Sequence, residues 1–222
     1  MSKPKNIFLV RHGLSIGNVD RNAYKIKPDW KIELAEKGHI QALEAGTKLA
    51  TLINTEVAFY VSPYKRTKQT LDEIIKSFDS TLIYSIKEDP RLREQEYGTG
   101  RSTKSELDFD IVEKERIDCG PFFYRLAGGE SPCDVYDRMT TFLDTLHRDF
   151  QKQDFPENVV IVTHGMAMRV FLMRWFHWDV DYFHRIRNPE NCGIAHMQLQ
   201  GNGKFLLKTE MQTREVNETE IK

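Results

Sequence analysis

Short apolar runs alternate with longer segments of helical periodicity along the 222 residues of this chain. Four runs have the length and composition of buried strands, and a turn or a polar residue ends each one; they span 7–10, 57–61, 81–86 and 159–162. Six other segments are predicted to be helices: 14–23, 34–53, 64–78, 104–118, 131–150 and 166–178. Apolar residues recur at helical spacing in 34–53, 64–78 and 131–150, whereas 104–118 is highly charged and 166–178 is apolar enough for a buried helix. Two closing strands, 194–199 and 205–211, flank Gly201-Asn202-Gly203, which is typical of a hairpin turn.

Helix start signals support several of these predictions. Ser15 is placed to cap the helix over 14–23, and Ser62-Pro63 precedes the helix over 64–78. The helix over 34–53 owes its predicted apolar face to five residues, Leu34, Ile40, Leu43, Leu49 and Leu52. Strands that alternate with helices predict a three-layer α/β/α sandwich with a mostly parallel central sheet. The length and the absence of repeats or linker-like tracts predict one domain over 1–222.

Composition narrows the possible partners. The formal net charge is −1, so no overall field attracts nucleic acid or an anionic membrane surface, and we expect neither as a partner. No apolar stretch approaches the roughly 20 residues that span a bilayer. The three cysteines, Cys119, Cys133 and Cys192, have neither the spacing of metal ligands nor that of a disulfide framework, which predicts a cytoplasmic protein.

Charged side chains follow all four strands of the predicted parallel sheet. Arg11 and His12 end the first strand, Arg66 follows the second, Glu94 comes after the third, and His164 follows the fourth. Because the carboxyl ends of parallel strands meet at one edge of a sheet, we expect these side chains to converge. Arginine forks match phosphate oxygens, and the helix-opening amides after Gly13, Ser62 and Gly165 add donors. The sequence therefore predicts a phosphoryl site at this edge.

Short motifs accompany these residues, in the order Arg11-His12-Gly13, Ser62-Pro63-Tyr64-Lys65-Arg66-Thr67, Glu94 before Tyr97-Gly98, Gly129-Glu130-Ser131 and Thr163-His164-Gly165. Each motif is weak alone, but together, over roughly 7–199, the chain resembles the histidine phosphatase (phosphoglycerate mutase-like) superfamily. The glycine after the second histidine resembles branch 1 of that superfamily. Residues 122–138 are similar to a plant and fungal subgroup of phosphoglycerate mutase-like proteins with a poorly defined substrate.

The resemblance implies a role for each motif residue. His12 is the expected nucleophile, which carries the phosphoryl group as a phosphohistidine. Arg11, Asn18, Arg66, His164 and the Gly165 amide are expected to bind the phosphate oxygens, and Glu94 to act as general acid and then as general base. We expect no metal and no other cofactor, because arginines and histidines supply the positive charge.

The substrate is less defined than the chemistry. Residues 95–130 are expected to form a substrate-specificity or lid insertion, with Tyr97 and Arg125 as possible contacts, and Arg185 and Arg187 as weaker ones. Glu96 is a rival to Glu94 as the acid. The remaining histidines match no catalytic position of the family.

Several functions remain open at this point. The first expectation is a phosphatase acting on a small phosphorylated metabolite. The single Arg125, where mutases carry paired arginines, disfavours a phosphoglycerate mutase, and a fructose-2,6-bisphosphatase is a further alternative. A regulatory binding module on the same fold is the non-enzymatic alternative, and a metal hydrolase lacks a ligand cluster. A homodimer is possible, because the apolar helix after His164 could pack internally or against a second copy.

Overall fold

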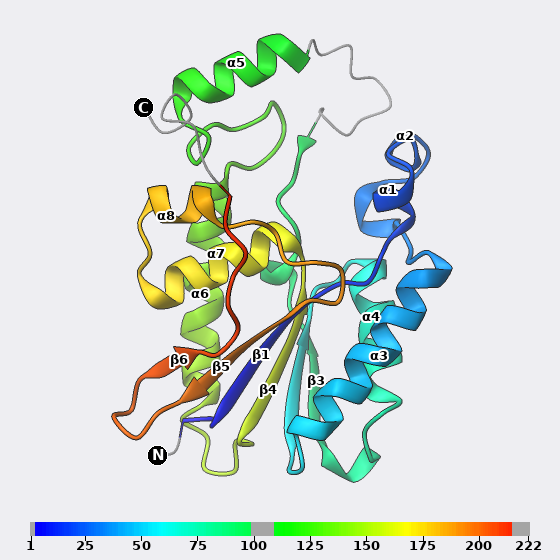
Figure 1. Ribbon diagram of the computed structural model, residues 1–222, viewed down its shortest axis with the longest axis vertical. Helices are drawn as coiled ribbons and strands as arrows, with labels where there is room; N and C mark the ends of the chain where they lie inside the picture. Colours follow the sequence, from blue (N-terminus) through cyan, green and yellow to red (C-terminus); the bar gives the residue numbers. More distant parts are fainter. Residues whose placement is uncertain (1–2, 99–108, 215–222) are drawn as a thin grey trace.

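The computed structural model describes residues 3–98 and 109–214 and places a mixed sheet at the centre of the protein (Figure 1). Its strand order is β3-β2-β4-β1-β5-β6, with four parallel strands and an antiparallel pair at one side. The strands are β1 (Asn6–Arg11), β2 (Val57–Val61), β3 (Ile83–Glu88), β4 (Asn158–Thr163), β5 (Ile194–Leu199) and β6 (Phe205–Leu207).

Helices cover both faces of this sheet. The long helices are α3 (Glu36–Leu52), α4 (Lys65–Ile75), α5 (Phe109–Cys119), α6 (Pro132–Asp149) and α7 (Gly165–Phe176). The short ones are α1 (Ile16–Val19), α2 (Ala23–Ile26) and α8 (Val180–Arg185), with 3-10 turns at Asp29–Lys31, Ser80–Leu82 and Pro90–Leu92.

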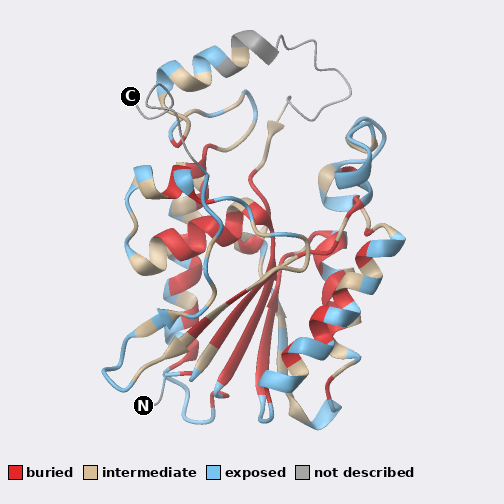
Figure 2. Ribbon diagram, in the orientation of Figure 1, coloured by how far each residue is buried: buried red, intermediate tan, exposed pale blue. Residues whose placement is uncertain are grey.

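Alternate residues of the central strands β1, β2 and β4 enter two separate cores, because successive side chains in a strand point to opposite faces. Ile7 and Leu9 pack with α6 and α7, whereas Phe8 and Val10 pack with α3 and α4. Figure 2 shows the central strands buried between these two layers. The predicted α/β/α sandwich is confirmed.

The register of the parallel strands brings their carboxyl ends level with one another. Arg11 at the end of β1 pairs with Thr163 at the end of β4, and the next amide, that of His12, donates to the Thr163 carbonyl at 3.0 Å. The Ser62 amide, after β2, donates to the Val162 carbonyl at 3.1 Å. The Thr163 hydroxyl donates to the Leu92 carbonyl at 2.8 Å, which ties the segment after β3 to the same edge.

The predicted helix over 14–23 is wrong as a single element. The chain forms two one-turn helices, α1 and α2, separated at Asp20, which has extended backbone angles. The predicted cap is present, because Ser15 and Asn18 form a reciprocal capping box at the start of α1. A Cβ at Gly17 would come within 2.5 Å of the Tyr24 ring. The missing side chain at Gly17 therefore lets α2 pack closely against α1.

The apolar face expected for α3 is also partly wrong. Ile40, Leu43 and Leu52 are exposed, while Leu49 is buried together with small residues, namely Gly38, Ala42, Ala45 and Gly46. A Cβ at Gly46 would lie 2.7 Å from the Ile74 carbonyl oxygen of α4. The helix therefore packs through its small residues, because they allow the two backbones to approach closely.

Other boundaries differ by a few residues, and α8 is an additional helix. The predicted helix over 104–118 lies partly outside the described residues, and its described part is α5. The last strand is shorter than predicted and ends at Leu207. Within residues 3–98 and 109–214, the structure contains no helix that is both long and apolar enough to span a bilayer.

Candidate active site

His12 lies at the end of β1 with its ring almost fully buried. Its Nδ1 lies 2.7 Å from the Gly13 carbonyl oxygen. A carbonyl can only accept, so Nδ1 carries the proton and the lone pair remains on Nε2. Gly13 itself is required by a close approach, because a Cβ there would lie 2.4 Å from the carbonyl oxygen of Gly38 in α3.

His164 lies beside His12, with the ring centroids 5.2 Å apart and the rings edge to face. It is fully buried, and its Nε2 lies 2.8 Å from the Ser62 hydroxyl at the end of β2. Burial lowers the pKa of His164 well below its usual value, and the charges of Arg66, His12, Arg138 and Arg11 lower it further. His164 is therefore a neutral ring at neutral pH, within a cluster of cationic groups.

Arg66 reaches this cluster from the first turn of α4 and is 2% exposed. Its guanidinium donates to Asp29 twice, at 2.8 Å to the carbonyl oxygen and 2.7 Å to the carboxylate. The Tyr64 ring lies between the guanidinium, 4.9 Å away, and the His164 ring, 5.0 Å away. These contacts fix the position of a buried arginine before any ligand binds.

Arg11 contributes a second partly buried guanidinium, which donates to the Pro189 carbonyl oxygen at 2.5 Å. Burial lowers the pKa of Arg11, while the nearby carboxylates of Glu94 and Glu190 act in the opposite direction. Three buried nitrogen atoms of the site, the Nε atoms of Arg11 and Arg66 and the Nδ1 of His164, have no hydrogen-bond partner among the described residues. We refer to Arg11, His12, Arg66, Glu94 and His164 as the strand-end cluster.

Glu94 joins the cluster through the start of α7. Its Oε1 accepts from the amides of Gln95 at 3.0 Å and Ala167 at 3.2 Å, and its Oε2 accepts from the Met166 amide at 3.3 Å. These amides fix the position of the Glu94 carboxyl group at the start of α7. A carboxylate has about four acceptor sites, so one remains for a substrate atom.

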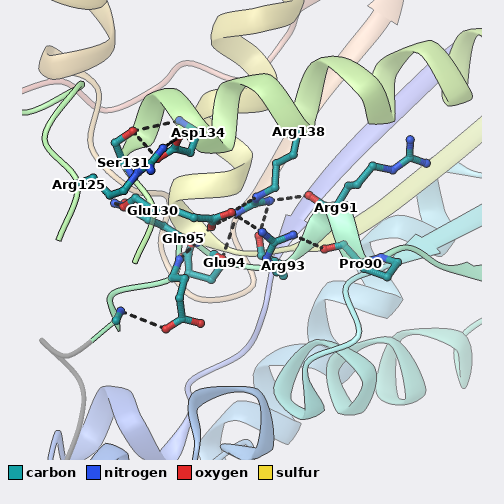
Figure 3. Close-up of polar contacts among 12 residues, drawn as sticks. Pro90, Arg91, Arg93, Glu94, Gln95, Arg125, Glu130, Ser131, Asp134 and Arg138 are labelled. Carbon is teal, nitrogen blue, oxygen red and sulfur yellow. Dashed lines mark hydrogen bonds and ion pairs between the residues drawn. The ribbon is translucent and has the colours of Figure 1, made fainter. Parts of the chain in front are cut away.

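A half-buried ion-pair network holds the backbone around Glu94 (Figure 3). Arg138 of α6 donates to the carbonyl oxygens of Arg91 at 2.6 Å, Arg93 at 3.0 Å and Glu94 at 3.1 Å. Glu130 accepts from the guanidinium groups of both Arg138 and Arg93. Because three carbonyl oxygens of this loop accept from one guanidinium, the position of Glu94 depends on α6.

The remaining predicted phosphate ligands are already engaged within the protein. Asn18 lies at the edge of the cluster, and its Oδ1 accepts from the Ser15 amide and from Asn191, which also donates to the His12 carbonyl oxygen at 3.1 Å. The Gly13 amide donates to the Thr70 hydroxyl at 3.0 Å. Gly165 begins α7, and the two amides that follow it, those of Met166 and Ala167, donate to the Glu94 carboxylate; the role of the Gly165 amide itself stays a prediction.

The two predicted specificity residues lie in different environments. Tyr97 is half-buried and lines a cavity beside Glu94, whereas Arg125 is absent from the described residues that line this cavity. Arg125 is exposed and pairs with Asp134 at the start of α6, a contact that the sequence did not suggest. Glu96, the rival acid, accepts from the Gly98 amide at 3.2 Å.

Sequence reasoning missed the residues that position the cluster. Asp29 lies between the predicted helices over 14–23 and 34–53, where nothing in the sequence distinguished it from a solvent-exposed acid. Ser62, Arg138 and Glu130 stand inside quoted motifs, but their contacts with His164 and with the Glu94 loop depend on tertiary packing. In the described parts of the chain, no group of three or more His, Cys, Asp or Glu residues is arranged to hold a metal ion.

Guanidinium groups lie around two histidine rings at this edge of the sheet, and guanidinium forks match the geometry of phosphate oxygens. The chain belongs to the histidine phosphatase superfamily (branch 1), whose family model matches residues 7–212. It is 43% identical over 218 residues to phosphoglycerate mutase-like protein AT74H of Arabidopsis thaliana, covering 91% of this chain and 76% of the relative.

Two further comparisons extend this relationship. The chain is 28% identical over 302 aligned residues to the broad-range acid phosphatase DET1 of Saccharomyces cerevisiae, covering 94% of this chain and 90% of that one. The solved structure of YhfR from Bacillus stearothermophilus superposes with a TM-score of 0.72 at 23% identity, over 92% of this chain and 96% of that one, and shows the same fold.

Proposed function

We propose that the protein is a phosphatase that hydrolyses a small phosphorylated metabolite through a phosphohistidine on His12. The proposal rests on three buried nitrogen atoms near His12, those of Arg11, Arg66 and His164, which have no hydrogen-bond partner among the residues that the structure describes. Buried polar groups are otherwise almost always hydrogen-bonded, so such a group of donors is typical of a site that binds an anion. The yeast relative DET1 is a broad-range acid phosphatase, which supports hydrolysis as the reaction.

The first half of the reaction transfers the phosphoryl group to the protein. The Nε2 lone pair of His12 forms a bond to phosphorus while the bond from phosphorus to the leaving oxygen breaks. The Glu94 carboxyl group gives its proton to the leaving oxygen. Arg11 and Arg66 donate to the phosphoryl oxygens, whose charge they balance without a metal ion.

The second half returns the protein to its starting state. Glu94, now a carboxylate, accepts a proton from water as the water oxygen bonds to phosphorus. The bond from phosphorus to Nε2 breaks, its electron pair returns to His12, and inorganic phosphate leaves. His164 remains neutral and contributes a hydrogen bond rather than a charge, because burial lowers its pKa.

Trapping of the phosphorylated protein tests this mechanism. Rapid acid-free quenching after mixing with a ³²P-labelled phosphomonoester should give label on a histidine that is stable in alkali and lost in acid. His12→Asn should abolish the label and lower hydrolysis by roughly three orders of magnitude or more. His177→Asn is the matched control, because His177 is exposed and adopts the left-handed conformation that asparagine tolerates.

Two outcomes would redirect the proposal. Wild-type rates in His12→Asn would remove His12 from the mechanism. Steady formation of 2-phosphoglycerate from 3-phosphoglycerate with a bisphosphate primer, at rates above hydrolysis, would make the protein a mutase instead.

A further inference from the structure

Ser62 lies where β2 ends, and its hydroxyl group contacts the ring of His164. The residue is fully buried, and its hydroxyl oxygen lies 2.8 Å from the His164 Nε2. The Ser62 amide donates to the Val162 carbonyl oxygen of β4 at 3.1 Å, and the Ser62 carbonyl oxygen accepts from the Thr67 hydroxyl of α4 at 2.9 Å. The sheet and α4 therefore fix the hydroxyl group relative to the His164 ring.

The direction of this hydrogen bond follows from the other partner of the Ser62 hydroxyl. A hydroxyl group has one proton to donate and two lone pairs that accept. The Tyr64 amide donates to the Ser62 oxygen at 3.4 Å, which uses one lone pair. The Ser62 proton needs an acceptor, and in the described parts of the chain the His164 Nε2 is the acceptor within reach. Because a buried donor without an acceptor is unfavourable, Ser62 donates to Nε2.

This direction determines the tautomer of His164. Burial lowers the pKa of His164 well below its usual value, so the ring is neutral at neutral pH and has one protonated nitrogen. Nε2 accepts from Ser62 and therefore holds the lone pair, which leaves the proton on Nδ1. The Nδ1 atom is buried and has no hydrogen-bond partner among the described residues. It is a donor that is available to a ligand.

His12 and His164 are thus the same tautomer, but the protein binds opposite nitrogen atoms of the two rings. In His12 the protonated Nδ1 donates to the Gly13 carbonyl oxygen, and the lone pair of Nε2 is left for the substrate. In His164 the lone pair of Nε2 accepts from Ser62, and the proton of Nδ1 is left for the substrate. The ring centroids are 5.2 Å apart, so one phosphoryl group can meet both atoms.

We infer that Ser62 is a positioning residue of the active site, whose hydroxyl group keeps the His164 proton on Nδ1, where it donates to an oxygen of the transferring phosphoryl group. This inference rests on the proposed function for the identity of the anion. The other tautomer would direct a lone pair at the phosphoryl oxygens, which are themselves negatively charged, and would weaken their binding. Ser62 therefore acts through His164.

Nuclear magnetic resonance measures the tautomer directly. Long-range ¹H–¹⁵N correlation spectra of ¹⁵N-histidine-labelled protein at neutral pH distinguish protonated from unprotonated ring nitrogens, and the spectrum of His164→Gln identifies the His164 signals by their loss. We expect a protonated Nδ1 and an unprotonated Nε2 in the wild-type protein. A protonated Nε2, alone or in a doubly protonated ring, would overturn the inference. This measurement needs neither a substrate nor catalytic activity.

Two variants test the role of the hydroxyl group. Ser62→Ala removes it, so no hydrogen bond with a described residue holds the His164 proton on Nδ1, and the tautomer protonated on Nε2 should appear. Inhibition by vanadate, an oxyanion that mimics the transferring phosphoryl group, should weaken by about fivefold to a hundredfold, as for the loss of one partner of a buried hydrogen bond. Ser62→Thr keeps a hydroxyl group and should retain both the tautomer and the inhibition.

Ser85→Ala is the matched control. Ser85 lies on β3 of the same sheet, and its hydroxyl oxygen is buried without a hydrogen-bond partner among the described residues. The same substitution there should leave the His164 tautomer and the inhibition by vanadate unchanged. Urea denaturation of each variant separates a loss of stability from a loss of anion binding, because Ser62→Thr and Ser62→Ala should differ in vanadate inhibition even where both are less stable than the wild-type protein.

The outcomes separate this inference from the proposed function. Weaker inhibition in Ser62→Ala with the tautomer unchanged would show that packing accounts for the loss, and would overturn the inference. A changed tautomer with unchanged inhibition would also overturn it, since the Nδ1 proton would then contribute nothing to anion binding. Either result leaves the phosphatase proposal standing. If no phosphomonoester is hydrolysed, the phosphatase proposal fails, and the ¹⁵N spectra of the wild-type protein and Ser62→Ala still decide the role of Ser62.

Discussion

The strand-end cluster and the cavity that Tyr97 lines lie side by side, yet they are built in different ways. The cluster stands on the ends of β1 and β4 and on segments tied to them by sheet hydrogen bonds, such as that from the His12 amide to Thr163. The cavity, which we call the basic pocket, collects cationic side chains from three helices and a terminal segment, namely Arg116, Arg169, His184 and Arg214. Backbone pairing thus positions the groups assigned to the proposed reaction, whereas helix packing positions the groups that would select a substrate.

The difference explains why one region is more recognisable than the other. A strand end fixes a side chain within two or three residues of an apolar run, so it produces a short motif. A pocket between helices requires no particular spacing, because any element that crosses the space can supply a cation. In folds that host many functions, the reaction chemistry can stay the same while the residues that select the substrate vary separately.

The largest effect is expected at the acid of the strand-end cluster. Glu94→Gln should lower kcat by about 10²–10⁴-fold for an alkyl phosphate, because the leaving oxygen loses its proton donor. With 4-nitrophenyl phosphate, whose leaving group needs no proton, phosphorylation of His12 should remain fast and the phosphohistidine should accumulate. Quench-flow with ³²P label measures both steps. Glu96→Gln is the control, and a comparable loss there would transfer the acid role to Glu96.

A smaller effect is expected at a residue that acts through Arg66. Asp29→Asn removes the carboxylate that accepts from Arg66 but keeps the carbonyl oxygen that also accepts from it. We expect a fall of roughly tenfold to a hundredfold in kcat/KM, typical of a misplaced binding group. Inhibition by vanadate should weaken in parallel. Unchanged inhibition together with reduced stability would make Asp29 a purely structural residue.

The burial of His164 predicts a pH-dependent stability. Its pKa in the folded state lies below the ordinary 6.5, so the unfolded chain binds more protons as the pH falls below that value. The free energy of unfolding should be constant above about pH 6.5 and should fall below it, by up to about 1.4 kcal/mol per pH unit from this group. Urea titrations between pH 8 and 5 measure this slope.

Comparison of His164→Gln with the wild-type protein shows how much of this pH dependence comes from His164. His164→Gln should reduce it by the contribution of one group, while His147, His184 and His196, whose pKa values are also lowered, contribute equally to both proteins. The carboxylates with a pKa of about 2, those of Glu33, Asp134 and Asp149, contribute only at lower pH. An identical slope in His164→Gln would contradict the buried neutral ring.

The smallest effect is expected at Arg125, outside both regions. Its ion pair with Asp134 is exposed, and exposed pairs contribute about 0–1 kcal/mol. Arg125→Ala should change kcat/KM less than twofold for both an alkyl phosphate and 4-nitrophenyl phosphate. A larger loss for one of the two substrates would extend the basic pocket to this residue and restore its predicted role in specificity.

The sequence by itself determined the sandwich fold and brought the motif residues of the site together. Apolar runs of four to six residues predict buried strands. Because these strands alternate with helices along the chain, they predict a parallel sheet. Because parallel strands share one carboxyl edge, Arg11, His12, Arg66 and His164 could be grouped without coordinates. Their roles in catalysis remain predictions.

Tertiary structure alone decided the features that depend on packing between distant elements. Small residues together with Leu49 form the buried face of α3, since they let its backbone approach that of α4 closely. The contact of Asp29 with Arg66 and that of Arg138 with the Glu94 loop join segments far apart in sequence. The basic pocket follows the same rule: its arginines have no common spacing, and only the folding of α5, α7, α8 and the terminal segment brings them together.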